Sequence, residues 1–249
     1  MSSENNMPSA KYEQIYKKIR EDILAGVYAF GDFLPSENEL TVLCGCTRNT
    51  VRRAIGILTA EGFLLPQHGR GVQVIYSPET GKSLFTVGGI ESFSEAAQRN
   101  SLRVTTRVVG FEELRADETL SRRTGFDPDS ELFHVQRIRS FSGEPIIYDE
   151  NYFLKSEMPG LTRKIAGKSI YDYLEKELGM TITTSKRRVT AEPAIPEDIR
   201  YLSLHGLDFV LIVTGQVFNS RGVMFEYTQS RHVPDRVCFI ESAVRQKII

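Results

Sequence analysis

The sequence predicts an α+β protein made of two domains. Three observations favour this fold class: helical periodicity followed by a single hairpin in residues 1–75, an aperiodic polar stretch at about residues 76–87, and tight turns between strand-like runs beyond it. The length of 249 residues also exceeds the usual size of one domain. We therefore expect a small domain at residues 9–75, a linker at 76–87 and a larger domain at 88–249.

The three helices of the small domain are indicated by apolar spacing and by capping residues. A stripe of isoleucines along residues 12–25 is typical of an amphipathic first helix. Ser36 can cap a second helix while Glu39 reaches back to the cap, the reciprocal arrangement called a capping box. The glycine-containing turn 44–46 then precedes Thr47, a favourable cap for a third helix.

A β-hairpin is predicted directly after the third helix. Residues 63–65 and 72–74 are strand-like, and they flank the polar, glycine-rich stretch 66–71. Two short helices joined by a tight turn form a helix-turn-helix. With a hairpin after it as the wing, the small domain is expected to be a winged helix-turn-helix.

The third helix and the hairpin tip carry positive charge that the whole chain lacks. Residues 41–75 contain four arginines against a single glutamate. Arginine can pair bidentately with guanine and asparagine with adenine, and a thin loop with an arginine suits the minor groove. We expect double-stranded DNA as a partner, bound through Ser36, Glu37, Asn38, Thr47, Arg48, Asn49, Thr50, Arg52, His68, Gly69 and Arg70. The alternative is a surface helix whose arginines are merely solvated.

The larger domain is predicted to hold a largely antiparallel sheet with helices between some of its strands. The turns at residues 142–145 and 219–222 join strands too closely for a crossover helix, so these neighbours run antiparallel. Strands are expected at residues 104–111, 132–141, 146–153, 181–191, 209–218, 223–233 and 237–243, and helices at residues 92–100, 117–123, 169–178 and 196–204.

Composition excludes several classes of protein. With 41% hydrophobic residues, 25% charged residues and a formal net charge of -1, the chain is not intrinsically disordered. The longest purely apolar run, Phe209–Val213, is too short to span a membrane. The three cysteines do not fit a disulfide framework or a zinc site, so we expect reduced thiols in the cytoplasm and neither a metal nor a cofactor.

Two arginines and a helix start favour an anion site in the larger domain. Arg137 and Arg139 are two apart on a predicted strand, so both side chains point to one face, where paired guanidiniums can hold a phosphate. Ser169 begins a predicted helix, and its hydroxyl with the free backbone N–H groups would bind an anion. Ser92 or Ser94 could supply a second such site. The alternatives are a solvated strand face for the arginines and a plain helix cap for Ser169.

Several motifs carry a resemblance to a known family. Leu34-Pro35-Ser36-Glu37, Thr47-Arg48-x-Thr50-Val51-Arg52-x-Ala54 and Gly69-Arg70-Gly71, within residues 12–74, resemble the GntR family of bacterial repressors. Residues 92–95, 169–175 and 225–232 are similar to the HutC branch of that family, whose effector domain has a chorismate-lyase-like α+β fold, the UTRA domain. The likeness covers nearly the whole chain. It implies a repressor of a sugar-utilisation operon rather than an enzyme.

The resemblance also implies residues that bind a small-molecule effector, most simply a phosphorylated sugar. Ser92, Ser94, Arg137, Arg139, Ser169 and Tyr171 would lie around the phosphate, and Glu150, Glu226 and Arg231 near sugar hydroxyls. Glu150 and Glu226 would otherwise be structural hydrogen-bond partners. His232 stands where some relatives that bind amino-sugar phosphates carry an aromatic residue, which leaves the sugar open.

The sequence leaves open which effector binds and whether the protein is a regulator or an enzyme. Trehalose 6-phosphate, glucosamine 6-phosphate, N-acetylglucosamine 6-phosphate, an amino acid derivative and urocanate all fit the family resemblance. A lyase-type enzyme is the alternative from another class, since fold alone does not settle function. We expect a homodimer that binds a near-palindromic operator with both third helices.

Overall fold

The computed structural model describes residues 11–77, 83–86, 89–99 and 102–241. The chain divides into two compact units, one containing residues 11–77 and the other Gly89–Cys238. Each unit has its own hydrophobic core, and each is described by itself. The larger unit is a mixture of helices and an antiparallel sheet, which confirms the predicted α+β class.

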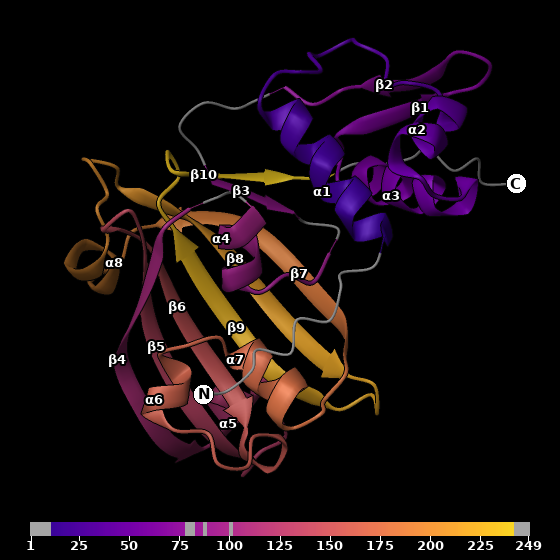
Figure 1. The fold of residues 1–249 in the computed structure, drawn as a ribbon. Helices are drawn as coiled ribbons and strands as arrows, with labels where there is room; N and C mark the ends of the chain where they lie inside the picture. Colours follow the sequence, from indigo (N-terminus) through magenta and orange to yellow (C-terminus); the bar gives the residue numbers. More distant parts are fainter. Residues whose placement is uncertain (1–10, 78–82, 87–88, 100–101, 242–249) are drawn as a thin grey trace, which may run out of the picture. The chain divides into compact units, whose positions relative to one another are not determined.

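The N-terminal unit consists of three helices and a two-stranded hairpin (Figure 1). Its elements are α1 (Lys11–Leu24), α2 (Glu37–Cys44), α3 (Arg48–Ala60), β1 (Leu64–Gln67) and β2 (Gly71–Val74). Apolar residues at helical spacing on α1 and α3 meet in one core that includes Ile15, Ile19, Val51, Ala54 and Leu58. The two strands pair antiparallel, with Gln67 opposite Gly71. This is the predicted winged helix-turn-helix.

Capping residues fix the angle between α2 and α3. Ser36 Oγ accepts a hydrogen bond from the Glu39 N–H at 3.3 Å, while a Glu39 carboxylate oxygen accepts one from the Ser36 N–H at 2.7 Å. The predicted capping box is thus formed, and it satisfies two backbone donors at the helix start. At the other end of α2 the chain turns through Gly45, whose φ of 57° is in the left-handed region that favours glycine. Thr47 then caps α3 through the Thr50 N–H.

The C-terminal unit is built on a six-stranded sheet in the order β4-β5-β6-β9-β8-β7, with every neighbouring pair antiparallel. The strands are β4 (Val104–Arg115), β5 (Glu131–Phe141), β6 (Glu144–Leu154), β7 (Ile182–Pro193), β8 (Phe209–Asn219) and β9 (Met224–His232). The predicted turns at 142–145 and 219–222 connect β5 to β6 and β8 to β9. The strand predictions are therefore confirmed in type and order, although β4 extends four residues further than expected.

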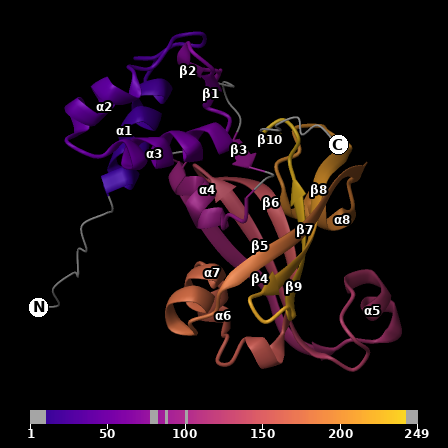
Figure 2. The ribbon, with the colours of Figure 1, turned by 90° about the vertical axis from the view of Figure 1, so that its right-hand side faces the viewer.

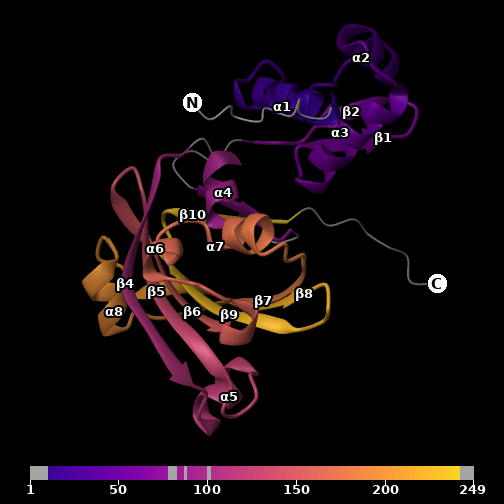
Figure 3. The same ribbon diagram turned by 60° about the horizontal axis from the view of Figure 1, so that its bottom comes forward.

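The helices of this unit lie on opposite faces of the curved sheet. α4 (Phe93–Arg99), α6 (Arg163–Ala166) and α7 (Ile170–Asp172), which continues into the π-helix η2 (Tyr173–Glu177), cover the concave face (Figures 2 and 3). α5 (Glu118–Thr124) and α8 (Pro196–Tyr201) lie on the other face. A short 3-10 helix, η1 (Lys155–Glu157), follows β6. All four predicted helical regions are present, and α8 ends three residues earlier than expected.

One strand pair was not foreseen. Ser83–Thr86 forms β3, inside the stretch expected to be an aperiodic linker, and it pairs with β10 (Val237–Ile240). The linker prediction rested on proline and glycine at residues 78 and 81, which lie outside the described residues, as do residues 242 and 243 of the predicted last strand. Phe85 on β3 contacts the rings of Phe141 and His232, so aromatic packing accompanies the pairing.

Each face of the sheet has its own apolar cluster. On the concave face Phe133, Phe153 and Val217 pack against Ile170 and Leu174 of the α7–η2 segment. On the opposite face Leu132, Tyr152 and Tyr227 pack against Phe126, which follows α5. Buried polar and charged side chains also lie on both faces, with Arg137 and Asp149 on the concave face and Arg231 on the other.

Candidate functional site

The start of α3 presents a polar surface of the kind that enters a DNA groove. Arg48, Asn49 and Arg52 are exposed, whereas Val51 and Ala54 on the opposite side of the helix are 0% exposed. The helical period therefore separates an anchoring face from a free face. The Arg52 guanidinium is held from α2, because its Nε lies 2.9 and 3.0 Å from the two carboxylate oxygens of Glu37.

The other predicted DNA-binding residues lie in the cap of α3, at the start of α2 and at the hairpin tip. Thr47 and Thr50 are 2.9 Å apart through their hydroxyls, both within the cap of α3. Ser36 is engaged in its own cap, and Asn38 is exposed on the first turn of α2. His68, Gly69 and Arg70 are exposed at the hairpin tip, between β1 and β2.

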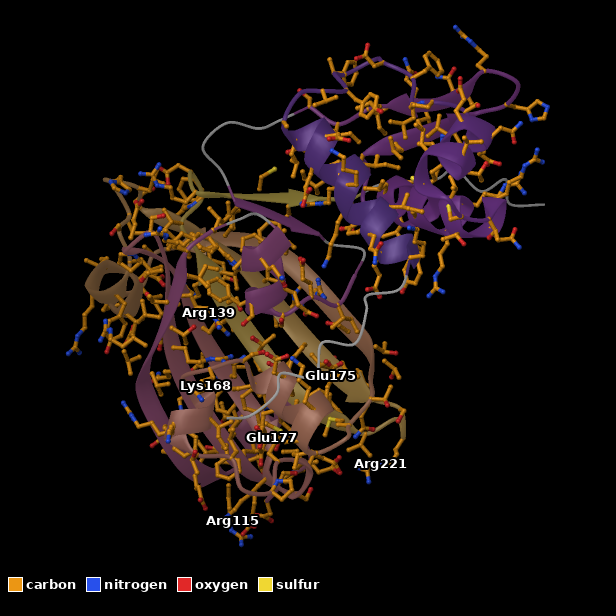
Figure 4. The ribbon with its side chains drawn as sticks, viewed as in Figure 1. Arg115, Arg139, Lys168, Glu175, Glu177 and Arg221 are labelled. Atoms are coloured by element: carbon orange, nitrogen blue, oxygen red, sulfur yellow. The ribbon has the colours of Figure 1, made fainter. Side chains whose placement is uncertain are left out.

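Sheet register divides the predicted effector residues between two faces. Residues directly opposite one another in a sheet point to the same face, and residues alternate along each strand. Arg137 pairs with Asp149 on β6, which pairs with Ser230 on β9, so these three share one face. Arg139, Glu226 and His232 fall on the same face by the same count. Figure 4 shows Arg139 on the concave face, whereas Arg115 and Arg221 lie toward the opposite end of the strands.

The two predicted phosphate-binding arginines are buried rather than solvated. Arg137 is 4% exposed and Arg139 is 8% exposed. Arg139 donates through Nε to a carboxylate oxygen of Asp149 at 2.5 Å, and its guanidinium lies 4.5 Å from the ring centre of Phe93 on α4. Arg137 donates to the side-chain oxygen of Asn151 at 2.8 Å. The Arg137 Nε, however, is buried with no hydrogen-bond partner among the described residues.

Electrostatics within this group follow from burial and from the paired charges. Burial, with Arg139 nearby, lowers the pKa of the Arg137 guanidinium to about 9. Burial opposes ionisation of Asp149 as well, but the guanidiniums of Arg139 and Arg137 outweigh it, so the pKa of Asp149 is lowered. Burial also lowers the pKa of His232, which favours the neutral imidazole.

Tyr171 and Glu226 connect α7 to the sheet. The Tyr171 hydroxyl donates to one oxygen of Glu226 at 2.9 Å, and the other oxygen accepts from the Asn151 amide at 2.9 Å. Burial raises the pKa of Glu226, and burial followed by the Glu226 charge raises that of Tyr171. Asn151 also donates to the Thr228 hydroxyl at 2.8 Å. These bonds form one group around Asn151, and the bonds of Asp149 to Arg139 and Ser230 form another; the two meet where a terminal nitrogen of Arg137 lies 3.9 Å from an Asp149 oxygen. Together they are called here the concave-face cluster: Arg137, Arg139, Asp149, Asn151, Tyr171, Glu226, Thr228 and Ser230.

The predicted serines mostly act as helix caps. Ser92 Oγ accepts from the Glu95 N–H at 3.2 Å, and the Ser92 N–H donates to the Glu95 carboxylate at 2.7 Å, a second capping box. Ser169 Oγ accepts from the Asp172 N–H at 3.2 Å at the start of α7. Ser94 is exposed in the first turn of α4. For Ser169 this is the capping role that the sequence left as one of two alternatives, and for Ser92 the capping role was not foreseen.

Glu150 and Arg231 do not lie with the other predicted effector residues. Both belong to the opposite face of the sheet by register. Glu150 bonds to His134 at 3.0 Å and to Arg123 at 3.1 Å. Arg231 lies against Asp198 of α8, with its Nε 2.8 and 2.9 Å from the two carboxylate oxygens. The expectation that these two side chains approach the same ligand as Arg137 is corrected by this register, because the sheet separates them from it.

Sequence reasoning missed several members of the concave-face cluster. Asp149 and Asn151 were not singled out, although they are two apart on β6, the same spacing that drew attention to Arg137 and Arg139. Thr228 and Ser230 repeat that spacing on β9. Polar residues at every second position of three consecutive strands are thus the signal that could have found them.

Metal and membrane chemistry find no support within the described residues. No group of histidine, cysteine or acidic side chains in residues 11–77, 83–86, 89–99 and 102–241 is arranged to hold a metal ion. Within the same residues, no helix is long and apolar enough to cross a membrane.

Comparison with known proteins gives the family. Residues 11–74 match the family described as bacterial regulatory proteins, gntR family, and residues 99–237 match the UTRA domain, which covers more than half of the chain. The HTH-type transcriptional regulator TreR of Bacillus subtilis is 36% identical over 95% of this chain and 98% of its own length. The chain belongs to the GntR family. The motifs at residues 34–37 and 47–54 had indicated this family, and those at 92–95, 169–175 and 225–232 had indicated the UTRA domain.

Solved structures agree with this assignment. The effector-binding domain of the B. subtilis trehalose repressor has a TM-score of 0.53 and 35% identity, and the match covers 57% of this regulator and 99% of that domain. The possible transcriptional regulator YydK from B. subtilis shares the fold at a TM-score of 0.77 and 22% identity, over 94% and 100% of the two chains. The GntR-type helix-turn-helix implies that this regulator binds operator DNA, and the UTRA domain implies an effector.

Proposed function

We propose that this regulator represses a sugar-utilisation operon and is released from its operator when a phosphorylated sugar, most simply trehalose 6-phosphate, binds the concave-face cluster. The observation that carries the proposal is the buried Arg137 Nε, which has no hydrogen-bond partner among the described residues. A buried polar group without a partner costs free energy, on the order of 1–3 kcal/mol and more for a charged group. An anionic ligand that accepts from this nitrogen removes the cost.

The chemistry of the cluster suits a ligand with one anionic end and several hydroxyls. Arg137 and Arg139 are adjacent guanidiniums on one strand, and guanidiniums are well matched to phosphate oxygens. Asn151, Glu226 and Thr228 offer donors and acceptors that suit sugar hydroxyls. The 36% identity with TreR, and the 35% identity with the trehalose repressor's effector-binding domain, favour trehalose 6-phosphate among the candidate effectors.

Release from DNA requires that the effector change the arrangement of the DNA-reading helices. We propose a homodimer in which two copies of α3 bind the two half-sites of a near-palindromic operator. The expected DNA contacts are Arg48, Asn49 and Arg52 on α3, with Arg70 in the wing. An effector that binds more tightly to a state with a different half-site spacing lowers operator affinity by population shift.

The experiment is a titration of effector against the protein–operator complex. An operator is selected from a random-sequence DNA pool with the full chain, and its dissociation is followed by fluorescence anisotropy. Trehalose 6-phosphate is expected to lower operator affinity by at least tenfold, whereas trehalose and inorganic phosphate added separately are not. If trehalose 6-phosphate leaves the affinity unchanged at millimolar concentration, the proposed effector is wrong.

A regulator of the same family that senses another ligand is the second candidate. Glucosamine 6-phosphate and N-acetylglucosamine 6-phosphate, which the family resemblance left open, belong in the same titration. Urocanate and an amino acid derivative serve as non-sugar controls. Release by one of these alone would assign the regulator to that ligand instead.

An enzymatic activity is the alternative from another class. The relatives are named as transcriptional regulators, which favours a non-enzymatic protein. The cluster's charged groups are engaged with one another: Asp149 accepts from Arg139 and Ser230, and Glu226 accepts from Tyr171 and Asn151. A turnover assay with aromatic pyruvyl ethers is expected to give no product. Measurable turnover would support the alternative hypothesis that the protein is a lyase-type enzyme.

A further inference from the structure

Arg187 on the edge strand β7 shares the concave face with the cluster, although neither sequence motifs nor family resemblance singled it out. It pairs with Gly215, which pairs with Thr228, which pairs with Asn151. Since paired residues point to the same face, Arg187 approaches the cluster from the side opposite to Arg137. The cluster thus lies between guanidiniums on both sides.

Glycine at position 215 leaves room for the Arg187 side chain to lie over β8. A Cβ at Gly215 would lie 3.8 Å from the Arg187 Cγ and 3.1 Å from the Thr228 methyl group. The second distance is tighter than ordinary van der Waals contact, so a side chain at 215 would press on Thr228 and close the space beside Arg187. Glycine at position 215 therefore keeps open the space through which the Arg187 side chain extends from β7 toward the cluster.

Two hydrogen bonds orient the Arg187 guanidinium. Its Nε donates to the Ser185 hydroxyl at 3.1 Å, and one terminal nitrogen donates to the Gly89 carbonyl at 2.6 Å, in the segment that leads into α4. The charge of Arg187 also acts on Tyr171, where it opposes the rise in the pKa of that hydroxyl. Arg187 is thus electrostatically coupled to a group that itself bonds Glu226.

Charge on this face favours an anionic or strongly hydrogen-bonding ligand. Arg137, Arg139 and Arg187 supply three guanidiniums, while Asp149 and Glu226 supply two carboxylates. These five side chains together therefore carry an excess of positive charge before any ligand binds.

From this arrangement we infer that Arg187 contacts the sugar ring remote from the phosphate and makes the site selective for a disaccharide phosphate. The inference rests on the proposed function, since it assumes that the phosphate lies at Arg137 and Arg139. β5 and β7 are separated by four strand-to-strand steps, about 19 Å along a flat sheet. A ligand held at Arg137 must extend across β6, β9 and β8 to meet Arg187, which a second ring allows and a single phosphorylated hexose does not.

The test compares trehalose 6-phosphate with glucose 6-phosphate by calorimetry and competition on the full chain. Wild type is expected to prefer the disaccharide phosphate. Arg187→Ala should weaken trehalose 6-phosphate binding by about 10- to 150-fold, the range for a hydrogen bond to a charged group, and should leave glucose 6-phosphate within threefold of wild type. Arg188→Ala is the matched control, because Arg188 is the next residue of β7, exposed on the other face.

A second variant guards against a purely structural effect. Gly215→Val keeps Arg187 but fills the space beside it, so it should show the same selective loss, with thermal melting used to confirm folding. Equal loss for both sugar phosphates in Arg187→Ala, no loss at all, or equal wild-type affinity for the two would overturn the inference while leaving the proposed function intact. Wild type that binds neither sugar phosphate would instead overturn the proposed function itself, and the inference with it.

Discussion

The two faces of the six-stranded sheet both bury arginine, and the difference between them separates structural pairing from ligand binding. On the outer face, the one covered by α5 and α8, Arg231 and Asp198 form an ion pair and are 3% and 0% exposed. Asp198 also accepts a hydrogen bond from the Ile195 N–H at 2.9 Å. On the concave face, Arg137 is equally buried, yet its Nε has no partner among the described residues. Burial alone does not mark a binding site. What distinguishes the concave face is a buried guanidinium with unused hydrogen-bonding capacity beside a second buried guanidinium, that of Arg139.

The largest expected effect tests the outer face as a structural element. Asp198→Ala leaves the Arg231 guanidinium buried without its partner, and breaking a buried pair in this way costs about 3–5 kcal/mol. The variant should lose that much unfolding free energy in urea denaturation. Ligand affinity of the fraction that remains folded should be unchanged.

A matched change on the exposed surface controls for the outer-face test. Arg122 and Glu118 on α5 form an exposed i, i+4 pair at 3.6 Å, so Glu118→Ala should cost well under about 1 kcal/mol. If Asp198→Ala proved no more destabilising than Glu118→Ala, the claim that the buried Arg231–Asp198 pair stabilises the fold would be wrong.

The second prediction tests the concave face as a binding element. Arg137→Met removes the guanidinium and keeps an apolar side chain of similar length, so a buried donor without a partner disappears along with the charge. Stability should fall less than when Arg139 is replaced, because Arg137 bonds Asn151 at 2.8 Å but lies 3.9 Å from Asp149, which keeps its direct bonds to Arg139 and Ser230. Affinity for trehalose 6-phosphate should fall by about 1.5–3 kcal/mol, the value of a hydrogen bond to a charged group.

Arg139→Met is the informative companion to Arg137→Met. Arg139 donates directly to Asp149 at 2.5 Å, so its loss leaves a buried carboxylate without its principal partner. That variant should lose both stability and ligand affinity. Equal losses of unfolding free energy in the two variants would show that the unpaired Nε of Arg137 does not lower the stability of the fold.

The N-terminal unit could be predicted almost completely from its sequence because its determinants are local. The capping box of Ser36 and Glu39, the glycine turn at residue 45 and the cap at Thr47 each act within four residues, and all three are formed. The predicted isoleucine stripe of residues 12–25 likewise forms the buried face of α1, at Ile15, Ile19 and Ile23. The pairing of Arg52 with Glu37, fifteen residues apart, is the feature that local reasoning did not foresee.

The composition of the candidate site was harder to predict because one bulge decides it. At the β5–β6 turn Phe141 pairs with Glu144, and continuing that register would put Glu150 opposite Val135, on the face of Arg137. A register shift between Arg139 and Ser140 moves every later residue of β6 by one, and a shift of one residue reverses the face. Asp149 thereby faces the same side as Arg137, whereas Glu150, which the family resemblance places near sugar hydroxyls, faces the other side.

The third prediction concerns the DNA-reading surface, whose residues remain a proposal. Arg48→Ala and Arg52→Ala should each weaken operator binding by about 1–3 kcal/mol if the arginine reads a base. Glu37→Gln keeps the Arg52 guanidinium but removes the carboxylate that holds it 2.9 Å away, so it should weaken binding less than Arg52→Ala. Gel-shift titrations at constant salt measure all three. Wild-type affinity in both arginine variants would exclude α3 as the reading helix.

The smallest expected effect is a pH dependence that arises on the outer face. Burial opposes protonation of His134, but hydrogen bonds to Glu150 and Glu112, at 3.0 and 2.8 Å, outweigh it and raise the pKa of His134 above 6.5. A raised folded-state pKa contributes stability that is fully present below the unfolded value near 6.5 and is lost as pH rises through the folded value. The pKa of Glu150 is lowered, so its own contribution is lost only in acid, outside this window.

Unfolding free energy measured in urea should therefore decline from pH 6 upward in wild type and more weakly in His134→Gln. Parallel pH profiles for the two proteins would mean that the imidazole between the two carboxylates carries no charge that matters to the fold.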